Sequence, residues 1–228
     1  MIKYAQLDQC IKEIMRFNSI AHSEEERNSE EYRKLCQALV TEEDTETKEA
    51  QTLKDKLDGY CDVVVVAAQA SECPNIDDDT KLAAYVKMCW AIHEACNEKY
   101  QGVPAFDFYG ALMEVALNNN SKFPLLSEVK EMYGEDYQNA ACDWIESQGR
   151  YTGVYCVERK DLEGNTRVVF KSKASSGKVL KWANYIDVDL SPYVVKTKEV
   201  KLTDEQFEEY TKRADQHGRV KLDKGEEV

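Results

Sequence analysis

Residues 41–70 read TEEDTETKEAQTLKDKLDGYCDVVVVAAQA. Six of the first nine side chains are ionisable, and the last eight residues are apolar except for Gln69. A β-branched run of this length also suits a buried strand, but the length of the segment and its alanine-rich end favour a helix. The stretch therefore predicts a charged helix followed by a buried one.

The sequence around this stretch is typical of helices up to about residue 120. It contains three glycines and two prolines between residues 4 and 120, and apolar residues recur at helical spacing. We expect helices over 4–17, 30–50, 53–70 and 106–117, and another that begins at a cap on Asp79. We expect this last helix to bury the face that carries Leu82, Val86, Cys89, Trp90, His93 and Cys96. Trp90 and His93 should be core residues.

The pattern changes after about residue 140. YTGVYCVERKDL (151–162) and NTRVVFKSK (165–173) flank Glu163-Gly164 and predict a β-hairpin, and residues 202–216 return to a helical pattern with Thr203 as the cap. We expect a mainly α fold. Residues 1–135 should form a bundle of four to five helices, residues 136–220 a small C-terminal α+β extension with the hairpin, and residues 221–228 a disordered tail.

Composition and charge restrict the function. The 228 residues include 43 Asp and Glu against 30 Lys and Arg, and the formal charge of −13 argues against a nucleic-acid partner. No apolar stretch approaches a membrane span, so we expect a cytoplasmic protein without a membrane partner. The eight cysteines are scattered without a CxxC pair, which favours reduced, buried thiols over disulfides or a zinc site.

Two acidic pairs occupy positions that should face the core. The apolar stripe of the helix over 30–50 continues through Glu43 and Glu46, and Asp58 and Asp62 share a face with the valines of the next helix. Two helices joined by a short connection pack antiparallel, which lets the pairs converge. Convergent carboxylates suit Mg²⁺ or Mn²⁺. The alternative is a solvated acidic face with pairs such as Asp44 and Lys48.

The spacing Glu42-Glu43-x-x-Glu46, followed by an acidic pair that ends at Asp62, resembles the all-α NTP pyrophosphohydrolase superfamily. This superfamily includes MazG-like enzymes, dimeric dUTPases and phosphoribosyl-ATP pyrophosphohydrolases. EVALNNNSK (114–122) is similar to the EVxxSNxSK signature of its bacteriophage-type members, and GKVLK (177–181) is similar to their GKxxK element.

Three positions depart from the family pattern. The family's ExxD motif has Gly59 where its Glu should stand, so Asp58 or Asp55 must replace it. An aromatic residue that usually follows the Asp is Val65 or Val66 here, and the Ser of the signature is Asn118. The departures concern the metal ligands and the pocket for the base.

The resemblance implies a hydrolase that cleaves a (d)NTP to (d)NMP and pyrophosphate in nucleotide-pool control, in the host cytoplasm when a bacteriophage encodes it. It implies Mg²⁺, with Mn²⁺ possible, and a homodimer or homotetramer. The implied metal ligands are Glu43, Glu46, Asp58 and Asp62. Glu42 is the favoured general base or outer ligand, a role that Glu43 could exchange with it.

The resemblance also implies the residues that bind substrate. Asn119 and Lys122 would hold the phosphates, Lys122 as a catalytic charge, and the other implied contacts are Phe17, Arg33, Lys178 and Lys181. Two alternatives stay open: an activity like that of phosphoribosyl-ATP pyrophosphohydrolase, and a non-catalytic, metal-stabilised helical module for dimerisation or binding.

Residues 164–185 contain five basic side chains and no acidic one. Such a segment could form a lid that faces an anionic ligand, or an edge strand that lysines protect from pairing. The five residues are Arg167, Lys171, Lys173, Lys178 and Lys181.

Overall fold

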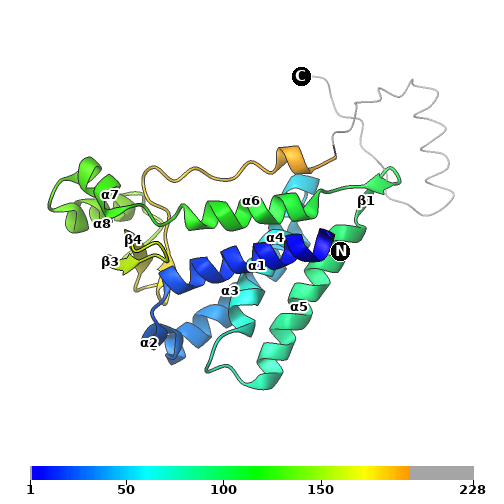
Figure 1. Ribbon diagram of the computed structural model, residues 1–228, viewed down its shortest axis with the longest axis horizontal. Helices are drawn as coiled ribbons and strands as arrows, with labels where there is room; N and C mark the ends of the chain where they lie inside the picture. Colours follow the sequence, from blue (N-terminus) through cyan, green and yellow to red (C-terminus); the bar gives the residue numbers. More distant parts are fainter. Residues whose placement is uncertain (1, 196–228) are drawn as a thin grey trace. The chain divides into compact units, whose positions relative to one another are not determined.

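Eight α-helices and two small antiparallel sheets make up residues 2–195, the part of the chain that the computed structural model describes (Figure 1). The helix predicted over 202–216, its cap Thr203 and the tail 221–228 lie outside these residues. The helices are α1 (Ile2–Ala21), α2 (Glu24–Arg27), α3 (Glu30–Glu49), α4 (Leu53–Ser71), α5 (Asp78–Asn97), α6 (Phe108–Asn120), α7 (Leu126–Tyr133) and α8 (Tyr137–Ser147). The prediction of a mainly helical fold with a small antiparallel sheet is confirmed.

Helix α4 is the centre of the bundle. It packs against α1, α3, α5 and α6, and its run from Val63 to Val66 is buried on every side. Thr52 begins the helix by accepting a hydrogen bond from the backbone N–H of Asp55 at 3.1 Å. The valine run is therefore helical, as its length predicts.

Helices α3 and α4 approach closely beside the acidic residues. A Cβ atom at Gly59 would lie 2.5 Å from Thr47 Oγ1 and 2.9 Å from Thr47 Cα, so only glycine fits at this crossing. Thr47 in turn donates a hydrogen bond from Oγ1 to the carbonyl oxygen of Glu43 at 2.6 Å. The glycine that departs from the family motif thus sets the separation of the two acidic helices.

Helix α5 differs from its prediction. Its N-cap is Asp77, not Asp79, because Asp77 accepts the hydrogen bond from the backbone N–H of Thr80 at 2.9 Å. The buried face carries Ala84, Ala91 and Ala95, whose small side chains let α5 lie close to α4.

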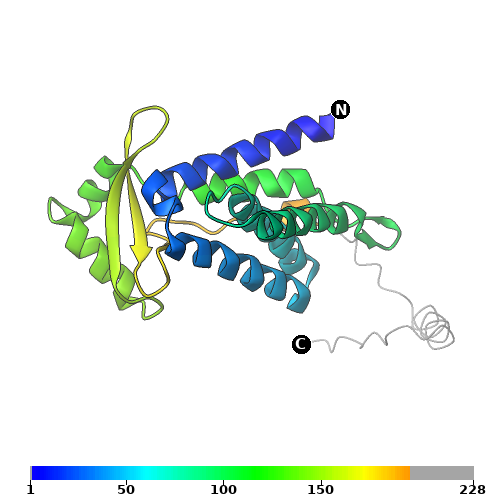
Figure 2. The same ribbon diagram turned by 90° about the horizontal axis from the view of Figure 1, so that it is seen from below.

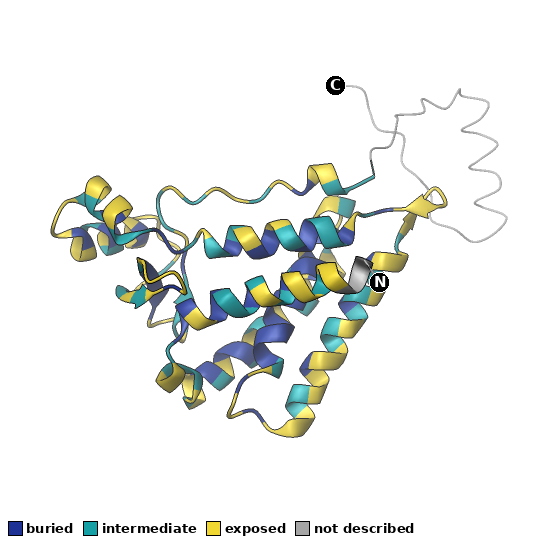
Figure 3. Ribbon diagram, in the orientation of Figure 1, coloured by how far each residue is buried: buried dark blue, intermediate teal, exposed yellow. Residues whose placement is uncertain are grey.

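Most residues of the predicted core face of α5 are exposed, so this prediction is wrong, and Figure 3 shows α5 as largely exposed or half-buried. Leu82 and Val86 are 60% and 56% exposed. Cys89, His93 and Cys96 are also exposed, so His93 is not a core residue. Trp90 is half-buried and meets the ring of Tyr60 edge-on at 5.9 Å.

The predicted hairpin forms, with β3 (Val154–Lys160) paired to β4 (Thr166–Ser172) and Gly164 at a positive φ of 83° in the turn. The short strand β5 (Lys178–Val179) adds to the other edge of β4. Alternate residues of β4 face opposite sides: Val168 and Phe170 pack with α7 and α8, while Val169 packs with α1. Figure 2 shows the long hairpin at one end of the bundle, with α7 and α8 against it.

After β5 the chain returns along α6 without regular structure until the short 3₁₀-helix Ser191–Tyr193. The Asn118 side-chain amide donates to the carbonyl oxygen of Ile186 at 2.8 Å, and the Trp182 indole donates to the carbonyl oxygen of Ser121 at 3.1 Å. These two bonds fix the returning segment to the last turn of α6. The other sheet is a hairpin of β1 (Lys99–Tyr100) and β2 (Val103–Pro104).

The cysteines follow their prediction in part. All eight lie within the described residues as free thiols, and Cys10, Cys36, Cys61 and Cys73 are buried. Cys89 and Cys96 are exposed, because they share the outer face of α5. None of the helices within residues 2–195 has the length and apolar character needed to cross a membrane.

Candidate active site

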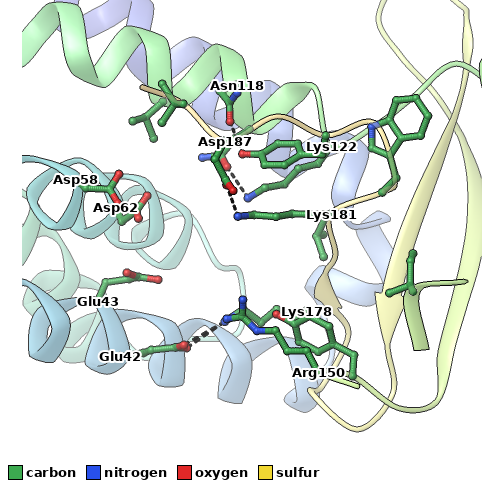
Figure 4. A pocket seen from close by; sticks show the side chains of 18 of the residues that line it. Glu42, Glu43, Asp58, Asp62, Asn118, Lys122, Arg150, Lys178, Lys181 and Asp187 are labelled. Atoms are coloured by element: carbon green, nitrogen blue, oxygen red, sulfur yellow. Dashed lines mark hydrogen bonds and ion pairs between the residues drawn. The ribbon is translucent and has the colours of Figure 1, made fainter. Parts of the chain in front are cut away.

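A cavity of about 580 Å³ opens between the helical bundle and the hairpin (Figure 4). Helices α3 and α4 form one wall. The last turn of α6, the end of α8 with the residues that follow it, and the segment 178–188 form the rest. Ligand pockets commonly have volumes of about 300–1,000 Å³, so this cavity can hold a nucleotide.

Four carboxylates line the cavity from α3 and α4. They belong to Glu43 and Glu46 of α3 and to Asp58 and Asp62 of α4. The prediction that all four face the core holds only in part, because Glu43 and Asp62 are half-buried whereas Glu46 and Asp58 are exposed. None of these side chains makes a hydrogen bond or an ion pair with another described residue. Their neighbour Asp44 instead faces away and pairs with Lys48 at 2.8 Å and Lys87 at 2.7 Å. The solvated-face alternative therefore holds for Asp44.

The carboxylates raise one another's pKa values. Burial raises the pKa of Glu43 to about 7, and the charges of Glu46, Glu42 and Asp58 add to the shift. Enclosure by the protein raises the pKa of Asp62 well above its usual range, with Glu43 and Asp58 adding to it. A wall of this kind favours the arrival of positive charge.

Without divalent ions, Glu43 is expected to make a contribution to stability that falls as the pH rises from about 4.5 to about 7. In this window Glu43 is protonated in the folded state but ionised in the unfolded chain, whose usual pKa is 4.5. The folded state therefore binds more protons, and the free energy of unfolding falls with pH. Urea unfolding at several pH values should show that Glu43→Gln gains stability relative to the wild type as the pH rises across this window, because the variant lacks this titration. Parallel curves for the two proteins would contradict the assignment.

The chemistry of this wall fits a hard divalent cation. All four donors are carboxylate oxygens, which Mg²⁺ and Mn²⁺ prefer. Within residues 2–195, however, no three Asp, Glu, His or Cys side chains are grouped closely enough to hold an ion by themselves. Mg²⁺ is usually bound by one or two carboxylates together with water and substrate phosphates. The wall therefore suits an ion that arrives with a phosphate ligand.

Lys122 faces the acidic wall from the end of α6 (Figure 4). Its ammonium group donates to Asn119 Oδ1 at 2.6 Å, and Asn119 is buried. Burial lowers the pKa of Lys122, and the nearby charge of Asp62 opposes this shift. The structure thus brings together the Asn and the Lys of the EVALNNNSK segment. Asn118 instead accepts a hydrogen bond from Tyr185 and holds the returning segment.

Two of the five basic residues of the segment 164–185 line the cavity. Lys178 lies on the edge strand β5 and contacts both carboxylate oxygens of Glu42 at 3.2 Å, and Lys181 pairs with Asp187. Both side chains lie opposite the acidic wall, as the lid hypothesis expects, and Lys178 also lies on an edge strand, as the alternative expects. The other three lie elsewhere: Arg167 pairs with Asp161 at 2.8 Å, Lys171 is buried against Glu26 at 2.9 Å, and Lys173 lies over Tyr155.

The other two residues that were expected to contact the substrate, Arg33 and Phe17, do not line the main cavity. Arg33 pairs with Glu30 on α3 and lines neither the main cavity nor its neighbour. Phe17 is buried and stacks on Phe123 with 4.8 Å between ring centroids. It lines a second cavity of about 140 Å³, the small cavity, which shares Asp62 and Lys122 with the main one.

Several lining residues were missed by the sequence analysis. Gln148, Arg150 and the aromatic residues Trp144 and Tyr151 come from the end of α8 and the loop after it. Trp182, Tyr185 and Asp187 come from the irregular segment after β5. Irregular segments lack a periodic pattern that would predict which side chains meet. The absence of acidic residues between positions 164 and 185 was the one feature of the sequence that indicated a role for this segment in the site.

Comparison with protein-family models, with curated proteins and with solved structures finds no match to this chain.

Proposed function

We propose that the protein is a Mg²⁺-dependent nucleoside triphosphate pyrophosphohydrolase, which cleaves a (d)NTP to (d)NMP and pyrophosphate. One observation carries the proposal: four carboxylates that form no ion pair with another described residue line one cavity together with Lys122, Lys178 and Lys181. The acidic wall would bind a divalent cation and the basic wall an anion. A metal–triphosphate complex satisfies both walls at once.

Charge neutralisation and positioning supply most of the catalysis in phosphoryl transfer, and a bound Mg²⁺ would provide part of both. Glu46, Asp58 and Asp62 would supply carboxylate oxygens to it, together with water and the substrate phosphates. Lys122 would contribute a fixed positive charge to the phosphates, and its hydrogen bond to Asn119 orients it. The residues that line the main cavity include no Ser, Cys or His, which supports attack by water.

Glu42 and Glu43 are the two candidates for the general base. Both carboxylate oxygens of Glu42 accept a hydrogen bond from the ammonium of Lys178 at 3.2 Å. Glu43 has no such partner, and its pKa of about 7 lies near the usual operating pH of a general base. The structure therefore favours Glu43 for proton acceptance, with Glu42 holding Lys178 in place.

The proposal is tested by incubation with a panel of dNTPs and NTPs and measurement of pyrophosphate. Release is expected with Mg²⁺ or Mn²⁺ and not with excess chelator. If no triphosphate yields pyrophosphate under either condition, the cavity serves another function. Full turnover in the chelator would equally contradict the role given to the carboxylates.

We also propose that the protein forms a homodimer or homotetramer through the outer face of α5. Leu82, Tyr85 and Val86 are more than half exposed there, which is unusual for neighbouring apolar side chains on one helix. Leu82→Glu is expected to reduce the mass measured by light scattering to that of a monomer. Lys81→Glu, one residue away on a polar position, is the matched control. A monomeric wild-type protein at micromolar concentration would contradict this proposal.

A further inference from the structure

The small cavity has the size of one six-membered ring. Its volume is about 140 Å³, and a cavity of about 150 Å³ in another protein holds benzene. The apolar part of the lining comes from α1, α3, α4 and β5 and consists of Phe17, Leu35, Leu39, Val65, Val66 and Val179. A fused two-ring base would need more room than these packed helices leave.

The small cavity adjoins the groups that would hold a triphosphate. Asp62, Asn119 and Lys122 line both cavities. A ligand whose phosphates contact Lys122 in the main cavity can therefore place a linked ring among the apolar side chains of the small one. Lys122 also lies 5.8 Å above the ring of Phe17, at the junction between the two spaces.

A buried amide without a partner lines the small cavity. Gln69 is 6% exposed, and its side chain makes no hydrogen bond with any described residue. The amide atoms of Gln69 are not among the enclosed polar atoms of the described residues that lack a partner, so they are open to the cavity, where a ligand or water can satisfy them. The Gln side chain presents a donor and an acceptor side by side. A pyrimidine offers the complementary pair at N3 and the exocyclic group on C4.

His22 supplies a second polar group at the same cavity. Its Nδ1 lies 3.3 Å from the ammonium of Lys171, which can only donate, so Nδ1 accepts and Nε2 carries the hydrogen. Burial and the charge of Lys171 lower the pKa of His22 to about 3, which keeps the ring neutral. The cavity thus combines apolar walls with the polar groups of Gln69 and His22, in addition to the charged and amide residues that it shares with the main cavity.

We infer that the small cavity selects pyrimidine nucleoside triphosphates, with Gln69 as the residue that reads the edge of the base. This inference rests on the proposed function, since the phosphates must lie against Lys122 for the base to reach Gln69. Size excludes purines, and the amide of Gln69 favours a ring that can pair with it.

The first test compares kcat/KM for dCTP, dUTP, dTTP, dATP and dGTP with Mg²⁺. The pyrimidine substrates are expected to exceed the purines by about tenfold or more, because a pocket of fixed size rejects an oversized ring. Gln69→Leu, which keeps the volume but removes the amide, should lower kcat/KM for the preferred pyrimidine by about 10–100-fold. Thermal unfolding of the variant distinguishes lost recognition from lost folding.

A pair of variants in α4 separates the size of the cavity from general packing. Val66→Ala enlarges the small cavity, whereas Val64→Ala removes the same atoms from a fully buried position outside its lining. Val66→Ala should raise the rate with dATP or dGTP relative to dCTP by about tenfold. Val64→Ala should leave the ratio unchanged even if it lowers stability more.

Equilibrium binding of the monophosphates dCMP, dUMP, dTMP, dAMP and dGMP gives a readout that does not depend on turnover. A pyrimidine preference that Gln69→Leu removes supports the inference. Purine triphosphates hydrolysed as fast as pyrimidines, with pyrophosphate released, would overturn the inference and leave the proposed function intact. No pyrophosphate from any triphosphate would overturn the proposed function, and equal binding of all monophosphates would then overturn the inference as well.

Discussion

Replacement of Glu43 by Gln or of Asp62 by Asn is expected to lower triphosphate turnover by about 10²–10³-fold or more, the effect of removing one preorganised charge from an active site. Both carboxylates line the main and the small cavity without a counter-ion. Each substitution keeps the shape of the side chain and removes one negative charge from the wall that binds the cation. Pyrophosphate release at saturating Mg²⁺ measures the loss.

Asp44→Asn is the matched control for these variants. Asp44 follows Glu43 directly on α3, but its carboxylate pairs with Lys48 and Lys87 outside the cavity. Its replacement should affect stability slightly and turnover by less than about twofold, because ion pairs of this kind contribute about 0–1 kcal/mol. Equal losses for Asp44→Asn and Asp62→Asn would show that the variants act through folding and not through the site.

Lys122→Ala is expected to raise KM and to lower kcat, with a loss of about 10²-fold or more in kcat/KM. Lys122 and Lys178 both line the two cavities, but burial and the charge of Asp62 both act on Lys122, so we expect Lys122 to contact the phosphates. Its charge acts on the substrate, and the four carboxylates remain. Binding of Mn²⁺ to the variant, measured by titration, should therefore be close to that of the wild type.

Lys173→Ala provides the control, because Lys173 is exposed and lies over Tyr155 away from the main cavity. If Lys122→Ala had an unchanged rate while Glu43→Gln was inactive, the assignment of the cation site would be correct and the assignment of the phosphate contacts would be wrong. Lys178 and Lys181 on the opposite wall would then be the groups to test.

Helical spacing was sufficient to predict the half-buried carboxylates of Glu43 and Asp62, but not the exposure of Glu46 and Asp58. Glu43 continues the stripe of Leu35 and Leu39, and Asp62 stands before a valine run that has to be buried. Both inferences use contacts within one helix or between consecutive helices, where the pattern of a single sequence is informative. The hairpin was predictable for the same reason, since its strands and its Gly164 turn are local.

The buried face of α5 was not predictable by the same rule. The rule assigns the largest apolar side chains to the core, but α5 packs through Ala84, Ala91 and Ala95, since close approach to α4 requires small residues. The exposed position of Leu82 follows from that packing. Whether a helix buries its alanines or its larger side chains depends on the partner helix, which the local pattern does not contain.

The basic wall and Gln69 show a second limit. Lys178 and Lys181 reach the cavity because β5 pairs with β4 and the chain then returns along α6, a path set by contacts between distant segments. Gln69 interrupts an apolar run, and only the structure shows that its amide lacks a partner. The sequence indicated unusual residues, but their meeting in one cavity depends on tertiary packing.

The most direct test of the proposed function is phosphorus NMR of dNTP hydrolysis in H₂¹⁸O with Mg²⁺. Attack by one water between the α- and β-phosphates should yield nucleoside monophosphate and intact pyrophosphate in equal amounts, with one ¹⁸O incorporated per turnover. Asp62→Asn should yield neither product at a comparable rate. Release of orthophosphate with accumulation of nucleoside diphosphate would contradict the proposed reaction.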